Sequence, residues 1–468
     1  MAFLTSSLFA LFPFKVQYPC SDSAVFISIG RMMHLGRIPY RDIFDHKGIV
    51  LYFIEYLGTF AGGYTGVYLI ELAGMFATVI FIYKAAALSC RNETVCLLTS
   101  FFSVYMLGSR MYEGANLSEE YALPCIAFSS YVFLLYLRTG QCRFFDFFFV
   151  GLTFTAVLLL RVNMVAPWAF YVPYFLVILL KDRKYSDLKT MVAGFACGMI
   201  VLFIPVMVYF HVTSSFRAMW ETYVLFNLMY VSDEGELRNV LGVMRMFVSV
   251  FAFPCICQFA AVLQQGKDRC HVVNALVFLV TLLSVSVSGR AYPHYGIILL
   301  PLCVLPVAYV LEKLRENLSL CAGVTAALVS RFCLSLLILI PLLGLPNPMK
   351  PGRIWQDSIV RYLREETAPD SDVLVLANEA KYYIAAERYT RQRFLFQEPV
   401  IRQDSALMRE FEEGVRANPP DYIVLSGYHW NWLHMPLLSG IREFLDETMS
   451  FYREIFADLG MCAIFRFN

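Results

Sequence analysis

Long apolar runs recur through the first three quarters of the chain, and each is about as long as one helical crossing of a bilayer. Ten of them lie at 64–83, 94–109, 121–137, 144–160, 164–180, 190–210, 240–263, 272–289, 295–311 and 321–343, and a shorter one at 2–14 makes eleven. Charged residues are 16% of the chain, against about 25% in soluble domains. The runs therefore predict an α-helical polytopic membrane protein with about eleven transmembrane helices.

Lysine and arginine fall in alternate loops between these runs, and this predicts the orientation of the chain. The loops in question carry Lys84 and Arg91, Arg138 and Arg143, Lys181 with Arg183 and Lys184, Lys267 with Arg269, and Lys313 with Arg315. Cytoplasmic loops of membrane proteins are enriched in these residues. We therefore expect a cell inner or plasma membrane protein whose N-terminus is cytoplasmic and whose tail is extracytoplasmic.

The sequence divides into a membrane part, 1–343, and a more polar tail, 344–468. In the tail, VLVL at 373–376, DYIVLSG at 421–427 and AIFRF at 463–467 are typical of buried strands, and helical stretches are expected near 379–387 and 405–417. This pattern predicts a small soluble α/β domain. The long first outer loop, 15–63, is expected to hold helices at 23–35 and 49–60 on either side of a turn region.

Polar residues with catalytic potential gather on the predicted outer side of the membrane part. They are Asp22, Arg41, Asp45, His46 and Lys47 in the first loop, Glu119 and Glu120 before the run at 121–137, Arg161 at a break between runs, and Arg290, His294 and Tyr295. Charges at the mouths of spans are costly unless they are paired or wet. A shared polar cavity is one interpretation of the set, and solvated loop charges or interface anchors are the alternative for each residue taken singly.

This mixture of acidic and basic groups favours a transfer reaction. A carboxylate can take a proton from a hydroxyl nucleophile, while lysine and arginine neutralise a phosphate leaving group. No G-x-S-x-G, H-E-x-x-H or P-loop pattern is present, so hydrolases and NTPases have no motif support. The 13 cysteines show no zinc-type spacing, so no cofactor is predicted and a divalent metal stays open without support. The net charge of +1 gives no reason to expect a nucleic-acid partner.

Several segments resemble the membrane glycosyltransferases of the GT-C fold, in the bacterial branch related to protein O-mannosyltransferases and aminoarabinose transferases. The run SDSAVFISIGRMMHLGRIPYRDIFDHKGIVLYFIEYLG is similar to that family's first outer loop. NLSEEYALP, RVNM and SGRAYPHYGIILLP resemble later landmarks in the same order, and ANEAKYYIAAERYTRQRFLFQEP with PPDYIVLSG resembles the extracytoplasmic domain. The resemblance covers nearly the whole chain.

The resemblance implies a transferase of the inverting type that moves a hexosyl or pentosyl group from a polyprenyl-phosphate carrier in the bilayer to a glycan, lipid or protein acceptor on the outer face. The family's base falls on Asp22 and its phosphate-binding lysine on Lys47. The second acidic motif falls on Glu119 and Glu120. Relatives often have an Asp-Glu pair where Ser23 follows Asp22 here, and some have glutamate where this chain has His46, so a divalent metal has no support.

The remaining polar residues receive roles from their chemistry. Arg290, and with it Arg161, is expected to bind the donor phosphate, because a guanidinium binds phosphate in bidentate fashion. Supporting or acceptor-binding roles are expected for Glu119, Glu120, Arg41, Asp45, His46, His294 and Tyr295. A rival assignment makes Glu119 or Glu120 the base and lets Asp22 cap the helix that starts near Ser23.

Two other functional classes remain open from the sequence. A transporter or flippase for lipid-linked glycans would place its charges near the bilayer midplane, often within repeats, and no repeat is visible here. A polymerase or ligase of surface polysaccharide would use similar lipid-linked substrates.

The topology can be tested with a reporter enzyme that is active only in the cytoplasm. Fused after Asn468, it should be silent, because the positions of the basic loops and the odd number of spans predict an extracytoplasmic tail. The same reporter fused in the loop at 181–184 should be active and serves as the control. Strong activity after Asn468 would contradict the topology.

Overall fold

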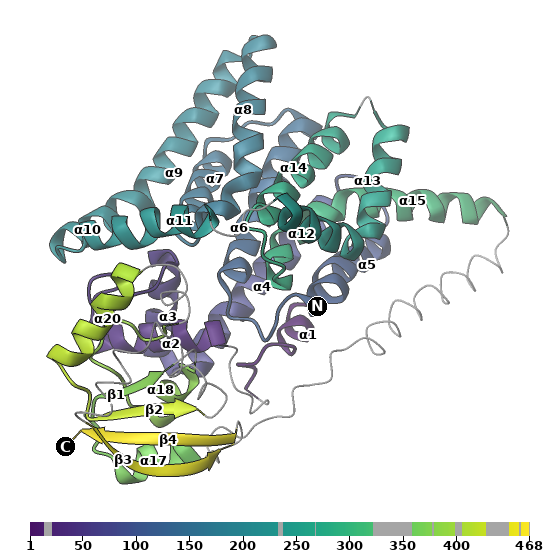
Figure 1. Ribbon diagram of the computed structural model, residues 1–468. Helices are drawn as coiled ribbons and strands as arrows, with labels where there is room; N and C mark the ends of the chain where they lie inside the picture. The colour runs from purple at the N-terminus through teal and green to yellow at the C-terminus, as the bar shows by residue number, and fades with distance from the viewer. Residues whose placement is uncertain are drawn as a thin grey trace. The chain divides into compact units, whose positions relative to one another are not determined.

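The structure is a computed structural model that describes residues 1–13, 21–232, 237–266, 268–321, 358–376, 379–397, 405–426, 449–457 and 460–467. The chain is mostly helical and divides into two compact units, whose elements are labelled in Figure 1. The membrane unit consists of Met1–Phe9, Leu69–Tyr209 and Val231–Pro348. The loop-tail unit consists of Ala10–Tyr68, Phe210–Tyr230 and Met349–Asn468.

Helices long and apolar enough to cross a bilayer supply most of the membrane unit. Six are found among the described residues, or seven if one bent pair counts as a span. The six are α4 (Tyr64–Ala86), α6 (Ser118–Thr139), η3 with α8 (Val162–Lys181), α9 (Tyr185–Val212), α14 (Arg269–Ser286), and η5 (Pro293–Cys303) with α15 (Val304–Cys321). The chain is therefore an integral membrane protein, and a total of eleven spans stays a prediction.

The other predicted runs form shorter or interrupted helices. Residues 94–109 divide into α5 (Glu93–Phe101), a π-helical segment η1 (Phe102–Leu107) and η2 (Gly108–Arg110), and 144–160 corresponds to α7 (Phe144–Leu158). The helix at the N-terminus, α1 (Ala2–Ser6), has only five residues. The run at 321–343 lies outside the described residues.

The predicted run at 240–263 is not one straight helix. It forms α12 (Leu237–Val250) and α13 (Ala252–Gln264), which are bent by 79°. Pro254 explains the break, because proline has no backbone N–H and its ring clashes with the carbonyl four residues earlier, here that of Val250.

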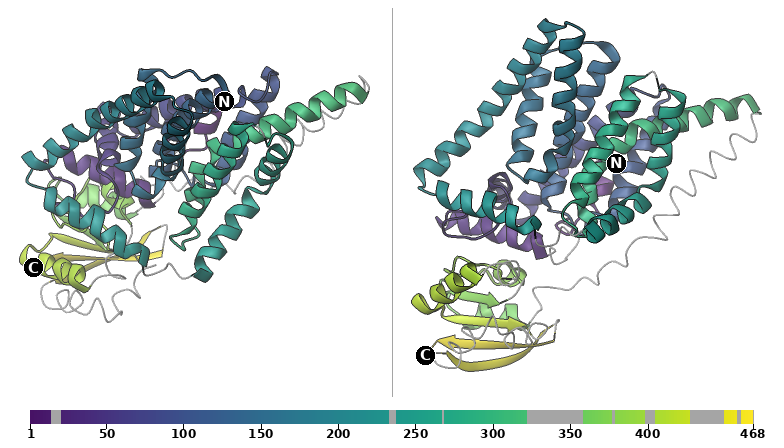
Figure 2. Two further views of the ribbon diagram at one scale, coloured as in Figure 1. Left: turned by 90° about the horizontal axis from the view of Figure 1, so that it is seen from above. Right: turned by 45° about the horizontal axis from the view of Figure 1, so that its top comes forward.

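Small residues allow close helix packing in the membrane unit. A Cβ added to Gly194 on α9 would lie 2.7 Å from the backbone oxygen of Phe144 at the start of α7. Only glycine permits this approach, and small residues at such contacts are typical of membrane helices, where lipid leaves van der Waals packing as a main attraction. The long α9 can be followed in the two views of Figure 2.

The η5 segment is an unusually long 3₁₀ helix of 11 residues. Side chains of neighbouring elements donate hydrogen bonds to its carbonyls. Ser103 Oγ donates to the carbonyl of Leu300 at 2.7 Å, and Asn274 Nδ2 donates to that of Leu302 at 2.8 Å. Water is absent from the hydrocarbon core, so polar backbone groups there need protein partners. These contacts fix the position of η5, whose first residues include His294 and Tyr295.

The loop-tail unit begins with a pair of helices, α2 (Ser21–His34) and α3 (Ile49–Gly62), close to the predicted 23–35 and 49–60. They approach closely at Gly30, where an added Cβ would lie 2.7 Å from the backbone of Glu55. The unit also contains α10 (Phe216–Met219), η4 (Trp220–Leu225) and α11 (Phe226–Ser232).

The tail contributes a four-stranded mixed sheet to the loop-tail unit. Its strands are β1 (Val373–Leu376), β2 (Tyr422–Ser426), β3 (Met449–Ala457) and β4 (Gly460–Phe467), in the order β1-β2-β4-β3, with β1 parallel to β2 and the other pairs antiparallel. Its helices are α17 (Ser358–Glu366), α18 (Lys381–Ala386) and α20 (Ser405–Ala417). The positions predicted for β1, β2, α18 and α20 are confirmed, and the predicted strand at 463–467 lies within β4. Strand β3 was not predicted, and the register shift between Phe451 and Arg453 interrupts its alternating pattern.

The core of the loop-tail unit joins segments that lie far apart in the sequence. Phe44 from the first loop packs against Phe226 of α11 and Phe394 of the tail, with ring centroids 5.3 Å and 5.1 Å apart. The same cluster includes Leu374 and Ile423 of the sheet. The first loop is therefore packed into the tail's hydrophobic core. The predicted separation into domains 1–343 and 344–468 stays a prediction.

Replacing Phe44 tests this packing. Phe44→Ala should destabilise the loop-tail unit by about 3–5 kcal/mol, because it removes a large side chain and leaves a cavity. Chemical denaturation and limited proteolysis of the detergent-solubilised protein would measure the effect. Phe60→Ala on α3 is the control, since Phe60 is 77% exposed and its loss should leave stability nearly unchanged. Equal stability of the two variants would contradict the shared core.

Candidate active site

Three predicted site residues meet in the membrane unit around a buried ion pair. Arg161 donates from Nη1 to Glu119 Oε1 at 2.5 Å and from Nη2 to the hydroxyl of Tyr295 at 2.7 Å. Only 14% of the Arg161 side chain and 4% of the Glu119 side chain are exposed. Ser118 Oγ donates to the second carboxylate oxygen of Glu119 at 2.8 Å. Both carboxylate oxygens are thus hydrogen-bonded, as a buried charge requires.

Each member of this group comes from a different break in regular structure. Glu119 lies in the first turn of α6, where a carboxylate is favoured by the helix dipole. Arg161 has extended backbone (φ −166°, ψ 124°) between α7 and η3. Tyr295 lies near the start of η5, and the guanidinium carbon of Arg161 is 4.4 Å from its ring centroid. Segments separated by 42 and 134 residues are therefore joined at one point.

Arg290 belongs to the same part of the membrane unit. Burial lowers the pKa of its guanidinium, and Arg161 lowers it further, while Tyr292 and Tyr295 act in the opposite direction. Tyr292 is also hydrogen-bonded to Arg290. Two guanidinium groups close enough to influence each other form a cationic region, and an anion such as phosphate would relieve their repulsion.

Glu120 points to different partners from those of Glu119. Its Oε2 accepts a hydrogen bond from the backbone N–H of Asn116 at 2.8 Å, and its carboxyl is close enough to that of Glu71 on α4 to interact with it. Both glutamates are buried. Glu120 therefore links α4 and α6, and Glu119 is the member of the pair that contacts a basic residue.

Four predicted site residues lie together in the loop-tail unit. The Asp45 carboxylate, 2% exposed, accepts from the hydroxyl of Tyr52 at 2.7 Å and from the backbone N–H of His46 at 2.8 Å. Burial raises the pKa of Asp45, and Asp22 raises it too, whereas Lys47 and the hydrogen bonds lower it. Asp22, Asp45 and Lys47 are thus close enough to interact electrostatically.

The hydrogen bond between Lys47 and His46 indicates which ring nitrogen of His46 carries the hydrogen. Lys47 Nζ can only donate, so His46 Nε2, 3.2 Å away, accepts and its hydrogen lies on Nδ1, which is 3.5 Å from Asp45 Oδ1. The backbone carbonyl of Lys47 accepts from Tyr40 at 2.7 Å. These contacts place the ammonium group of Lys47 on a rigid turn directly before α3.

Asp22 is the second residue of α2, inside its first turn and not at the N-cap. This differs from the alternative in which it caps a helix starting near Ser23, because the helix begins at Ser21. A carboxylate in the first turn is still favoured by the helix dipole. Its side chain is half-buried.

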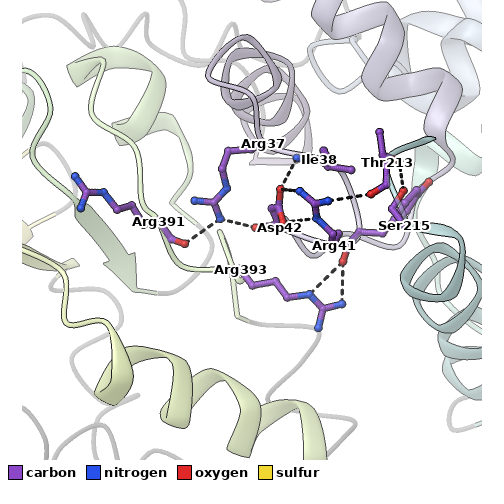
Figure 3. Close-up of polar contacts among 9 residues, drawn as sticks. Arg37, Ile38, Arg41, Asp42, Thr213, Ser215, Arg391 and Arg393 are labelled. Carbon is purple, nitrogen blue, oxygen red and sulfur yellow. Dashed lines mark hydrogen bonds and ion pairs between the residues drawn. The ribbon is translucent and has the colours of Figure 1, made fainter. Parts of the chain in front are cut away.

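Arg41 makes contacts within the loop-tail unit that stabilise the turn after α2. It donates from Nε and Nη2 to the Asp42 carboxylate at 2.8 Å and 3.0 Å, and from Nη1 to the carbonyl of Thr213 at 2.9 Å (Figure 3). The hydrogen bonds from Arg41 lower the pKa of Asp42 despite the opposing effect of burial, which is the largest single influence.

Arginines on both sides connect this turn to the tail. Arg37 donates from Nη2 to the carbonyls of Asp42 and Arg391 at 2.6 Å and 2.9 Å, and Arg393 donates from Nη2 and Nε to the carbonyl of Tyr40 at 2.9 Å and 3.1 Å (Figure 3). The backbone N–H of Phe44 donates to the carbonyl of Arg393 at 2.7 Å. The tail thereby holds the segment that leads into Asp45, His46 and Lys47.

Several residues of these networks were not predicted from the sequence. Tyr52 lies inside an apolar helical run, and Glu71 lies inside an apolar span. Glu113 contacts His294, with 2.6 Å between Oε2 and Nδ1. Glu113 could have been found from its position just before the NLSEE motif. Glu71 could have been found because a lone carboxylate within an apolar span is unusual. Among the described residues, no group of three or more His, Cys, Asp or Glu side chains is arranged to hold a metal ion.

Comparison with solved structures identifies the fold. The crystal structure of ArnT from Cupriavidus metallidurans bound to undecaprenyl phosphate matches 99% of this chain and 96% of its own length, with a TM-score of 0.63 and 12% sequence identity. The apo form of the same protein matches 95% and 92%, with a TM-score of 0.60 and 12% identity. This chain is thus a membrane protein with the GT-C fold of glycosyltransferases.

The family is shown by a sequence model. Residues 1–320 match the model described as "Putative competence-induced protein Ccs4 N-terminal domain", and the chain belongs to that family. A search of curated proteins gives no significant match.

Proposed function

We propose that this protein is a membrane glycosyltransferase that moves a sugar from a polyprenyl-phosphate carrier to a hydroxyl group of an acceptor. The observation that carries the proposal is the half-buried cationic region of Arg161 and Arg290, which lie at breaks between membrane helices beside Tyr295. Such a region at the end of apolar spans suits the phosphate of a lipid. The ArnT fold, solved with undecaprenyl phosphate bound, supports a carrier of this type.

Arg290 and Lys47 are assigned to the donor phosphate, with Arg161 as a further contact. Arg161 already has a carboxylate partner in Glu119, so its charge is largely balanced. Arg290 is destabilised as a cation by burial and by Arg161, and Lys47 Nζ lies 3.2 Å from an imidazole nitrogen of His46 and interacts with Asp45 through its charge alone. These two residues therefore have the most to gain from an anionic ligand.

Asp22 is assigned as the general base. It takes the proton from the acceptor hydroxyl while that oxygen attacks the anomeric carbon, and the bond from this carbon to the phosphate oxygen breaks with its electron pair on the phosphate. Substitution from the opposite face inverts the anomeric configuration. An ionised aspartate is a weak base, so it acts by being held within hydrogen-bond reach of the nucleophile. Glu119, whose oxygens are both hydrogen-bonded, supports Arg161.

The phosphate assignment predicts the effect of removing each cation. Lys47→Gln and Arg290→Gln should each weaken binding of undecaprenyl phosphate by about tenfold or more, because each loses a charge-assisted hydrogen bond. Binding to the purified full chain in detergent would be measured by ligand-induced thermal stabilisation at several concentrations. Lys189→Gln, at an exposed lysine of α9, is the control. Unchanged affinity in both site variants would remove these residues from the phosphate site.

The base assignment predicts a loss of transfer in Asp22→Asn. Asparagine keeps the size and an oxygen but cannot take a proton, so transfer should fall at least about a hundredfold. The measurement is mass analysis of lipid-linked sugars and surface glycans in cells that lack the protein, complemented with each variant. Asp370→Asn, at an exposed turn, should restore the normal pattern.

The same experiment separates Asp22 from its rivals. Activity retained in Asp22→Asn and lost in Glu119→Gln or Glu120→Gln would move the base to α6. An unaltered glycan pattern in cells without the protein would argue against a transferase.

A further inference from the structure

The ring of His294 contacts two tyrosines, each of which is bonded to one of the two arginines of the membrane unit. Its ring stacks on Tyr292, with centroids 5.4 Å apart and planes at 15°, and meets the ring of Tyr295 edge-on at 4.8 Å. Tyr292 is hydrogen-bonded to Arg290, and the hydroxyl of Tyr295 accepts from Arg161. One tyrosine thus connects each arginine to the same imidazole ring.

Glu113 holds this ring from the other side. Its Oε2 lies 2.6 Å from His294 Nδ1, and 39% of the Glu113 side chain and 11% of the His294 side chain are exposed. An ionised carboxylate only accepts, so Nδ1 carries a hydrogen and Nε2 is the position that can meet a ligand. Among the described residues Nε2 makes no hydrogen bond.

The backbone around Glu113 adopts a disfavoured conformation. Residues 113–116 all have positive φ, 47° at Glu113 and 57° at Asn116, and such angles cost free energy in residues other than glycine. Asn116 is held by its N–H bond to Glu120 and by a 2.6 Å hydrogen bond from the Tyr121 hydroxyl to its Oδ1. Buried contacts with α6 therefore maintain the turn that brings Glu113 to His294.

We propose that Glu113 is a positioning residue that makes His294 a contact of the carrier phosphate, an inference that rests on the proposed function. When each ring nitrogen carries a hydrogen, His294 donates from Nδ1 to the Glu113 carboxylate and from Nε2 to a phosphate oxygen. When the bond between the sugar and the phosphate breaks, the phosphate oxygen keeps the electron pair and takes the Nε2 proton. The ring regains a proton from water as the carrier leaves.

The proposal is tested by binding of undecaprenyl phosphate to the purified full chain and to Glu113→Gln and His294→Gln. Glutamine at 113 keeps an oxygen that accepts from Nδ1 but has no charge, so a purely structural contact survives. We expect about tenfold weaker binding in each variant at an unchanged melting temperature. The ³¹P signal of the bound phosphate should also shift, which loss of a structural contact alone would not cause. His34→Gln and Glu93→Gln, both exposed, are the controls.

The outcomes distinguish this inference from the proposed function. Absence of binding in the unmodified protein would overturn both. Binding that is weakened by Arg290→Gln but unchanged, with an unmoved ³¹P signal, in Glu113→Gln and His294→Gln would overturn the inference and leave the proposed function standing. If His294→Gln lowers the melting temperature, Glu113→Gln decides the question alone, because its half-exposed side chain tolerates an amide.

Discussion

The ion pair between Arg161 and Glu119 is the interaction on which the polar centre of the membrane unit depends. A buried charge is tolerated only when it is paired and its remaining hydrogen-bonding positions are filled, and removing one partner of such a pair typically costs about 3–5 kcal/mol. Ser118 and Tyr295 fill those positions. The ion pair therefore joins the first turn of α6, the break before η3 and the start of η5 at one point. Arg290 and His294 lie next to residues of this group.

The same rule explains why irregular backbone persists inside an apolar bundle. The η5 segment is a long 3₁₀ helix, and side chains such as Ser103 and Asn274 donate to its carbonyls. Irregular backbone at membrane depth survives only where protein groups satisfy it. In return, η5 presents His294 and Tyr295 in an arrangement that a regular helix, with its different periodicity, would not produce.

In the loop-tail unit, hydrophobic packing joins segments that are distant in sequence, as the ion pair does in the membrane unit. Phe44 is buried among side chains of the tail, and Arg393 binds the carbonyl of Tyr40 twice. The next three residues after Phe44 are Asp45, His46 and Lys47. The contacts of Phe44 with the tail therefore help to fix where the backbone of these residues lies. The tail thus helps to position a candidate catalytic region, although the polar residues of that region lie mostly in the first loop.

The sequence by itself determined the membrane location, the positions of most helices and three of the four strands, and the residue types at the site, because these depend on local periodicity and transfer free energy. It also singled out Arg161 and His294. Only the tertiary structure decided their partners: Glu119 is 42 residues from Arg161, and Glu113 is 181 residues from His294. Such pairs depend on how helices approach within a few ångströms and where a strained turn directs a side chain, and neither is encoded in a local pattern.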